Sequence, residues 1–136
     1  MIVVDSNVLA YLYLPGEFTA AAEALLEQEP EWAAPLLWRS EFRNVGTLYF
    51  RKGILTYDAV KEAVLQAEEL LWGYEEIVES EEVFPLIQKS KCSAYDCEFV
   101  ALALRLNTHL ITYDKKILNE FPEVAVKPEQ YLKIAK

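Results

Sequence analysis

Short apolar runs alternate with longer amphipathic stretches along this chain. The run Ile2-Val3-Val4 predicts a buried strand of a parallel sheet, and residues 109–112 predict a second one. Weaker strand signals lie at residues 32–34, 77–78 and 124–126. Apolar residues at helical spacing predict helices over residues 8–14, 18–29, 36–52, 56–71, 93–106 and 114–120, with another beginning at residue 80 and a helical or frayed tail. Strands that alternate with helices favour an α/β fold with helices on both faces of a parallel sheet.

The size and composition indicate one globular domain, residues 1–136. A chain of 136 residues with 53% hydrophobic and 26% charged residues is too short for two sizeable cores and too apolar to be disordered. No apolar run reaches the roughly 18 residues that cross a bilayer. The first residues lack the basic segment of a signal peptide, so we expect a cytoplasmic protein that does not associate with membranes.

The cysteine content argues against a structural zinc site. Cys92 and Cys97 have only His109 as a further soft ligand, whereas such sites use four Cys or His ligands. Cys97 falls inside a predicted helix, which makes a disulfide with Cys92 unfavourable. We expect both thiols to be reduced.

The net charge does not identify a partner. At −9, the chain lacks the basic balance of a protein that binds nucleic acid by electrostatics alone. However, a cluster of metal-binding carboxylates also makes a chain acidic, and a bound cation would reverse the local sign.

Two acids follow predicted strands. Asp5 ends the first strand and Asp114 follows the strand at residues 109–112, at the edge where open α/β sheets bind ligands. Each acid has a structural alternative. Asp5 is an ordinary helix N-cap residue, and Asp114 could cap a helix or pair with Lys115 or Lys116. Thr112, two residues before Asp114, could donate its hydroxyl to a carboxylate or to a metal-bound water.

Two further acids interrupt apolar helix faces. Glu41 shares a face with Trp38 and Val45, and its neighbours Arg39 and Arg43 point elsewhere on the same helix. A distant arginine could still neutralise it.

Asp96 lies on the face of Phe99, Val100 and Ala103. Its structural alternative is a capping box that begins at Ser93.

Together the four acids indicate a metal site. Carboxylates that converge without a counter-ion raise one another's pKa values and repel, and a divalent cation removes that penalty. Oxygen ligands without His or Cys favour Mg²⁺ or Mn²⁺ over zinc. Such an ion can activate water for in-line attack on a phosphodiester.

The residues that carry these acids resemble a known family. Val-Val-Asp5-Ser-Asn-Val-Leu, Ser40-Glu41-Phe-Arg-Asn-Val45, Ala94-Tyr-Asp96-Cys-Glu-Phe-Val-Ala-Leu-Ala103 and Leu110-Ile-Thr-Tyr-Asp-Lys-Lys-Ile-Leu118 occur in the order and spacing of a PIN domain. The chain most resembles a VapC-type toxin ribonuclease of a toxin–antitoxin pair. This resemblance implies a three-layer α/β/α fold with a parallel sheet of four or five strands.

The resemblance also implies an activity and a set of residues. It suggests a Mg²⁺- or Mn²⁺-dependent endoribonuclease in which Asp5, Glu41, Asp96 and Asp114 hold the metal and are catalytic. Thr112, Ser6, Asn7 and Asn44 would support the site. Basic residues near these motifs could contact RNA phosphates, namely Arg39, Arg43, Arg51, Lys52, Lys115 and Lys116.

The implied partners are RNA, a small antitoxin that blocks the site, and a second copy in a homodimer or dimer of dimers. An aromatic set could serve an interface or simply fill the core: Trp32, Trp38, Phe42, Tyr49, Phe50 and Trp72. A phosphoryl-transfer receiver domain is disfavoured because no Asp ends the strand predicted at residues 77–78. A non-catalytic PIN-like module that binds RNA or protein remains the alternative.

Overall fold

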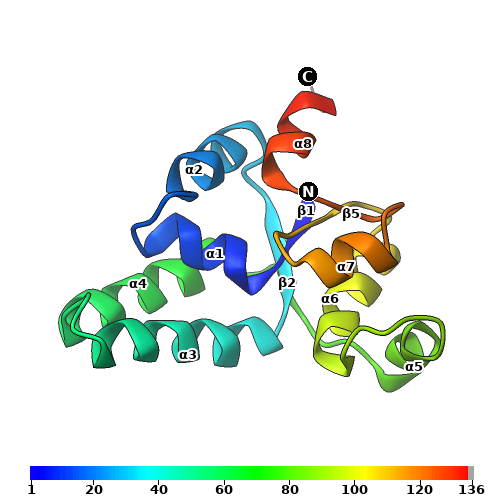
Figure 1. Ribbon diagram of the computed structural model, residues 1–136, viewed down its shortest axis with the longest axis horizontal. Helices are drawn as coiled ribbons and strands as arrows, with labels where there is room; N and C mark the ends of the chain where they lie inside the picture. The colour runs from blue at the N-terminus through cyan, green and yellow to red at the C-terminus, as the bar shows by residue number, and fades with distance from the viewer. Residues whose placement is uncertain (135–136) are drawn as a thin grey trace.

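The computed structural model describes residues 1–134, which form one parallel sheet and the helices around it (Figure 1). The sheet has five strands in the order β3-β2-β1-β4-β5, and every neighbouring pair is parallel. The strands are β1 (Ile2–Val4), β2 (Trp32–Pro35), β3 (Glu75–Glu76), β4 (Leu110–Ile111) and β5 (Ala125–Val126). The chain therefore starts in the middle of the sheet and adds two strands on each side.

Eight helices occur within residues 1–134. They are α1 (Ser6–Tyr13), α2 (Thr19–Gln28), α3 (Leu37–Arg51), α4 (Tyr57–Leu70), α5 (Ser80–Gln88), α6 (Ala94–Arg105), α7 (Lys115–Glu120) and α8 (Pro128–Ile134). Figure 1 shows α1 to α4 on one side of the sheet and α5 and α6 on the other. This arrangement confirms the predicted three-layer α/β/α fold. None of these helices has the length and apolar character that a membrane span requires.

The central strands are held by burial on both faces. Ile2, Val3 and Val4 in β1 and Leu110 and Ile111 in β4 are fully buried. Val3 pairs with Leu110 and Val4 with Ile111, so the residues that follow the two strands emerge side by side. Burying a side chain of this size contributes about 1.5–3 kcal/mol. The apolar residues from which β1 and β4 were predicted thus also fix how the two strands pair.

The strand predicted at residues 77–78 is wrong. The observed β3 is Glu75–Glu76, and Ile77 beyond it is exposed. β3 pairs with Ala34 and Pro35 at the edge of the sheet. An edge strand needs only backbone pairing on one side, so two glutamates can occupy it when their side chains find partners at the surface.

The aromatic residues divide between core and surface. Trp32, Trp38 and Phe42 are fully buried, which makes them core residues rather than interface residues. Trp32 Nε1 donates to the backbone oxygen of Glu29 at 2.7 Å, which satisfies its buried polar atom. Phe50 and Trp72 are 46% and 78% exposed. These two side chains remain available for contacts with another molecule.

Candidate active site

Four carboxylates lie around the carboxyl ends of the central strands. Asp5 directly follows β1, and Asp114 follows β4 after two residues. Glu41 lies in the second turn of α3, the helix that leaves β2, and Asp96 lies in the first turn of α6. The edge of the sheet predicted to bind a ligand is therefore the edge around which the four predicted acids are arranged.

Asp5 is the most buried of these acids, with 8% of its surface exposed. Its Oδ1 accepts the backbone N–H of Ser6 at 2.8 Å, and its Oδ2 accepts the Thr112 hydroxyl at 2.6 Å. Burial raises the pKa of Asp5 to about 7, with smaller contributions from the charges of Glu41 and Asp96, while the two hydrogen bonds lower it. A carboxyl group in this environment ionises readily only when a positive charge lies beside it.

Asp5 is also the N-cap of α1, as its structural alternative proposed. The helix begins at Ser6 rather than at Val8, the predicted start. Oδ1 accepts only the cap hydrogen bond, whereas Oδ2 accepts two, from Thr112 and Asn7. Because Oδ1 keeps a free acceptor position, capping does not prevent Asp5 from binding a cation.

Glu41 is held through Ser6. The buried Ser6 hydroxyl donates to Glu41 Oε1 at 2.7 Å, which connects α1 to α3. Burial raises the pKa of Glu41 and the charge of Asp96 raises it further, although the hydrogen bond from Ser6 opposes both effects. Glu41 and Asp96 therefore lie close enough for each to sense a charge at the other's position.

Asp96 and Asp114 both combine capping with electrostatic contact. Asp96 N donates to the N-cap hydroxyl of Ser93 at 3.0 Å, and Asp114 Oδ1 accepts the backbone N–H of Ile117 at 3.0 Å as the N-cap of α7. The pKa of Asp96 is raised by burial and then by the charge of Asp114, whereas hydrogen bonds with Ser93 and, to a smaller extent, the charge of Lys116 lower it. Lys116 is thus a cation beside this acid.

The four acids are not neutralised by ion pairs. Of the salt bridges that the structure describes within residues 1–134, none includes Asp5, Glu41, Asp96 or Asp114. The distant arginine proposed as a partner for Glu41 is therefore not seen there.

Arg39, a predicted RNA contact, forms a two-point hydrogen bond with Glu75 at 2.6 and 2.7 Å. It also reaches Glu68 at 2.9 Å. With three nitrogens engaged, Arg39 connects α3 to β3 and α4, and we do not assign it to RNA.

The predicted supporting residues occupy different surroundings. Asn7 Nδ2 donates to Asp5 Oδ2 at 3.3 Å, and its Oδ1 accepts the backbone N–H of Tyr113 at 3.5 Å. Thr112 is fully buried, and its hydroxyl also accepts the backbone N–H of Asp114 at 3.0 Å. Asn44 lies on the exposed side of α3, one turn after Glu41. Ser6, Asn7 and Thr112 therefore orient the acids, while Asn44 makes no such contact among the described residues.

The remaining predicted RNA contacts lie at the surface. Lys115 and Lys116 are exposed in the first turn of α7, directly after Asp114. Arg43 is exposed on α3 and lies 3.7 Å from Glu68. Arg51 and Lys52 are exposed at the far end of α3.

Glu98 is a fifth acid that the sequence pattern did not reveal. Burial raises its pKa, and the charge of Glu41 raises it further, which places Glu98 near Glu41. Two residues after Asp96, it falls on a different face of α6, so a search for acids within one apolar stripe overlooks it. The signal that could have found it is the spacing Asp96-x-Glu98 at the start of a helix.

The cysteines agree with the expectation of reduced thiols. Cys92 and Cys97 are both free and buried. Burial raises the pKa of each thiol, and the charge of Asp96 adds to the effect, so both remain protonated at neutral pH.

The donor set suits a hard divalent cation. Within residues 1–134, no three Asp, Glu, His or Cys side chains already stand in the arrangement of a metal cage. However, burial and the charges of neighbouring carboxylates raise the pKa values of Asp5, Glu41 and Asp96, and none of the three is in a salt bridge described for residues 1–134. Carboxylate oxygens with these properties are the ligands that Mg²⁺ and Mn²⁺ prefer, so the residues present fit such an ion.

Comparison with known proteins identifies the family. A family profile described as "PIN domain" matches residues 2–126. The chain belongs to the PIN-domain family. This PIN domain is 31% identical over 129 residues to a protein named Ribonuclease VapC3 from Pyrobaculum aerophilum, covering 89% of this chain and 95% of that one.

Solved structures share the fold. PAE2754 from Pyrobaculum aerophilum superposes with a TM-score of 0.77 at 16% identity, covering 98% of this PIN domain and 88% of that chain. FitAcB from Neisseria gonorrhoeae gives 0.72 at 17% identity, with 95% and 99% covered. A toxin–antitoxin complex from Klebsiella pneumoniae gives 0.67 at 21% identity, with 94% and 98% covered. At these identities the likeness supports the three-layer architecture of the PIN domain.

Proposed function

We propose that this PIN domain is a metal-dependent endoribonuclease and the toxin of a VapBC-type toxin–antitoxin pair. The observation that carries the proposal is the buried Asp5 at the end of β1. Its pKa of about 7 reflects burial above all, with smaller raising contributions from the charges of Glu41 and Asp96. Strongly perturbed pKa values of buried acids cluster at functional sites, which supports a bound cation there. The 31% identity to a protein named Ribonuclease VapC3 supports RNA as the substrate.

Asp5, Glu41, Asp96 and Asp114 would hold Mg²⁺ or Mn²⁺. Bound there, the ion would activate a water molecule and offset charge on the phosphodiester. Ser6 fixes the Glu41 carboxylate through its 2.7 Å hydrogen bond, and Thr112 fixes Asp5 at 2.6 Å. Because both hydroxyls are buried, these carboxylates are oriented before any ligand arrives.

Protonation of Asp5 would limit the activity at low pH. At neutral pH a substantial fraction of Asp5 carries a proton, given its pKa of about 7. That proton must leave before both oxygens can act as ligands. We therefore expect metal binding to release protons and to strengthen as the pH rises from about 6 to about 8.

The proposed partners follow from the relatives and the surface. The Klebsiella pneumoniae structure is titled a toxin–antitoxin complex, which supports a small antitoxin as partner. The exposed Phe50 and Trp72 offer apolar contacts for an antitoxin or for a second copy in a homodimer.

The test is cleavage of a labelled single-stranded RNA with Mg²⁺ or Mn²⁺ by the wild type, Asp5→Asn and Asp96→Asn. Each variant removes a charge but keeps the side-chain size, so circular dichroism should show an intact fold. We expect each to lose at least a hundredfold in rate. Arg39→Lys, which keeps a positive charge away from the four acids, is the matched control and should retain activity. Full cleavage by both Asn variants would reject the proposal and favour a non-catalytic module.

A further inference from the structure

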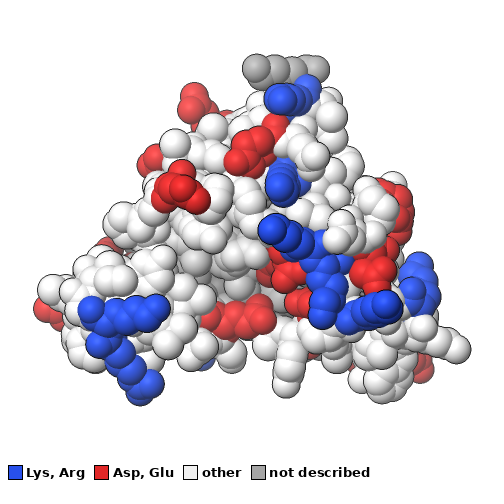
Figure 2. Space-filling model, viewed as in Figure 1, with Lys and Arg blue, Asp and Glu red and all other residues white. Residues whose placement is uncertain are grey.

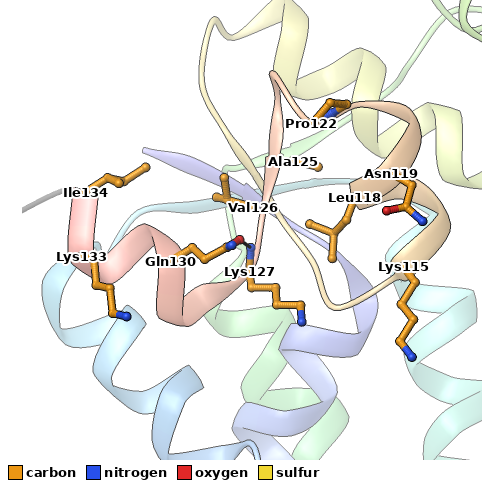
Figure 3. A pocket seen from close by; sticks show the side chains of 10 residues that line it. All are labelled: Lys115, Leu118, Asn119, Pro122, Ala125, Val126, Lys127, Gln130, Lys133 and Ile134. Atoms are coloured by element: carbon orange, nitrogen blue, oxygen red, sulfur yellow. Dashed lines mark hydrogen bonds between the residues drawn. The ribbon is translucent and has the colours of Figure 1, made fainter.

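A basic groove lies beside the candidate active site, between α7, β5 and α8. Its volume is about 630 Å³. Figure 3 shows Lys115, Lys127 and Lys133 extending along one side of it, with Gln130 between the last two. The floor is apolar and includes Leu118 and Val126. We call this surface the lysine groove.

The groove is positively charged in a chain that is otherwise acidic. The sequence has 22 acidic and 13 basic residues, yet no salt bridge described for residues 1–134 includes Lys115, Lys127 or Lys133. Figure 2 shows Lys and Arg side chains in a row from α8 towards α7, where they meet Asp and Glu side chains at the centre of the face. Unpaired cations in a row favour a polyanionic ligand.

One end of the groove is next to a candidate ligand in the chain. Lys115, which lines the groove, directly follows Asp114, the N-cap of α7. The other end is Lys133 in the last turn of α8. Lys127 directly precedes α8 and Lys133 lies near its end, so the two are separated by roughly 9 Å along the helix axis. The cations are therefore spread along the groove.

The rigid part of the groove is the start of α8. Gln130 Oε1 accepts the backbone N–H of Lys127 at 3.2 Å, which fixes the turn that presents this lysine (Figure 3). Leu118 and Val126 pack against the core beneath it. The lysine stems therefore start from an ordered surface, although their ammonium groups reach solvent.

We propose that the lysine groove binds the phosphate backbone of the RNA segment that flanks the cleaved bond. This inference rests on the proposed function. A polyanion approaching four carboxylates is repelled, so a substrate needs cations beside the acids to remain there. An acidic segment of a protein partner would fit the same charge, but it has no need to pass from the groove into the acids. Lys127 and Lys133 thus position the substrate and are not catalytic.

The test compares two double variants that lose the same charge. Lys127→Ala/Lys133→Ala removes the groove lysines, and Lys61→Ala/Lys89→Ala removes two exposed lysines, one on α4 and one at the end of α5. Neither Lys61 nor Lys89 lines the groove. Binding of a fluorescent single-stranded RNA is measured by anisotropy in EDTA, which prevents cleavage from altering the probe. A melting curve of each variant establishes that it folds.

The expected result is specific to the groove pair. Each lost phosphate contact reduces the salt dependence of log K by about 0.7, so the groove variant should show a slope shallower by roughly 1.4. Taking 1 M salt as reference, this corresponds to binding weaker by roughly 25-fold at 0.1 M salt. The control should bind as the wild type does. Equal binding by the two variants would overturn the proposal, whether or not the groove variant loses affinity for a poly-glutamate peptide.

Kinetics separates this inference from the proposed function. On a long RNA, the groove variant should show a raised KM with nearly unchanged kcat, because the acids are untouched. On a trinucleotide too short to reach α8, it should match the wild type. If the wild type cleaves RNA but the groove variant has an unchanged KM, the groove assignment fails and the nuclease remains. If the wild type binds RNA through the groove without cleaving it, the nuclease fails and the groove remains.

Discussion

Thr112 donates its hydroxyl to Oδ2 of Asp5 at 2.6 Å, which links the residue after β4 to the residue after β1. The same hydroxyl oxygen accepts the backbone N–H of Asp114 at 3.0 Å. One buried side chain therefore orients two of the four candidate ligands. Because Thr112 is fully buried, solvent water does not compete for these two hydrogen bonds.

Replacing Thr112→Val should damage the site while preserving the volume of the side chain. The hydrogen bond from Thr112 lowers the pKa of Asp5, so its loss should raise that pKa further and shift the acidic limb of the pH–rate profile upward. Activity at pH 7 should fall at least tenfold, and the free energy of unfolding should fall by about 1–3 kcal/mol. Thr112→Ser keeps the hydroxyl and should stay near wild type in both assays. An unchanged profile for Thr112→Val would contradict the assigned role.

The burial of Asp5 predicts an unusual pH dependence of stability. Its pKa is raised from 3.8 to about 7 in the folded protein, so folding favours the protonated form. The stability associated with this proton is complete below pH 3.8 and is lost as the pH rises to about 7. The loss is about 4 kcal/mol at most, because a tenfold change in proton affinity is about 1.4 kcal/mol.

Urea denaturation in EDTA at pH 5 and pH 8 measures this effect. The wild type should lose more stability between the two values than Asp5→Asn does, and Asp5→Asn should be the more stable protein at pH 8. Parallel losses in the two proteins would show that Asp5 is not the buried acid responsible.

Arg39 should matter for folding rather than for RNA. Its contacts with Glu75 and Glu68 join α3 to β3 and α4, and they lower the pKa of Glu75. Arg39→Ala should reduce the free energy of unfolding by about 1–3 kcal/mol, since charged hydrogen bonds are lost. The part due to Glu75 should diminish as the pH falls through its lowered pKa. The RNA affinity of the folded variant should equal that of the wild type. If log K for RNA depended less steeply on salt concentration in this variant, Arg39 would be an RNA contact after all.

Gly46 in α3 lies against Val60 in α4. A Cβ atom at Gly46 would lie 2.8 Å from Cγ1 of Val60. Alanine in a helix interior is normally more stabilising than glycine by about 1 kcal/mol. Here we expect Gly46→Ala to lower stability by about 1–3 kcal/mol because of the clash. In a Val60→Ala background the same change should instead raise stability, and a gain in the wild-type background would disprove the close contact.

The central strands and the acids were predictable because their signals are local. Ile2-Val3-Val4 and Leu110-Ile111 are short apolar runs that each precede an acid, and parallel strands carry such residues to one edge. Helical spacing also predicts that Glu41 shares a face with Trp38, which is buried, and a charge on such a face indicates a special role.

The features that the sequence did not reveal depend on contacts between distant residues. Glu75 and Glu76 have the composition of a loop, yet backbone pairing with β2 and the ion pair with Arg39, 36 residues away, make them an edge strand. Likewise, Glu98 becomes part of the acidic surroundings through Glu41, which comes from another helix. The groove between α7 and α8 needs β5 between them, and the strand signal there was weak.

The most direct test of the account is cleavage of RNA by the wild-type protein in excess EDTA, followed by addition of Mg²⁺ or Mn²⁺ beyond the chelator. The account predicts no cleavage in EDTA, recovery on addition of either ion, and no recovery with Asp5→Asn under the same conditions. Cleavage at the full rate in EDTA would contradict it, because the four carboxylates would then have no part in the reaction.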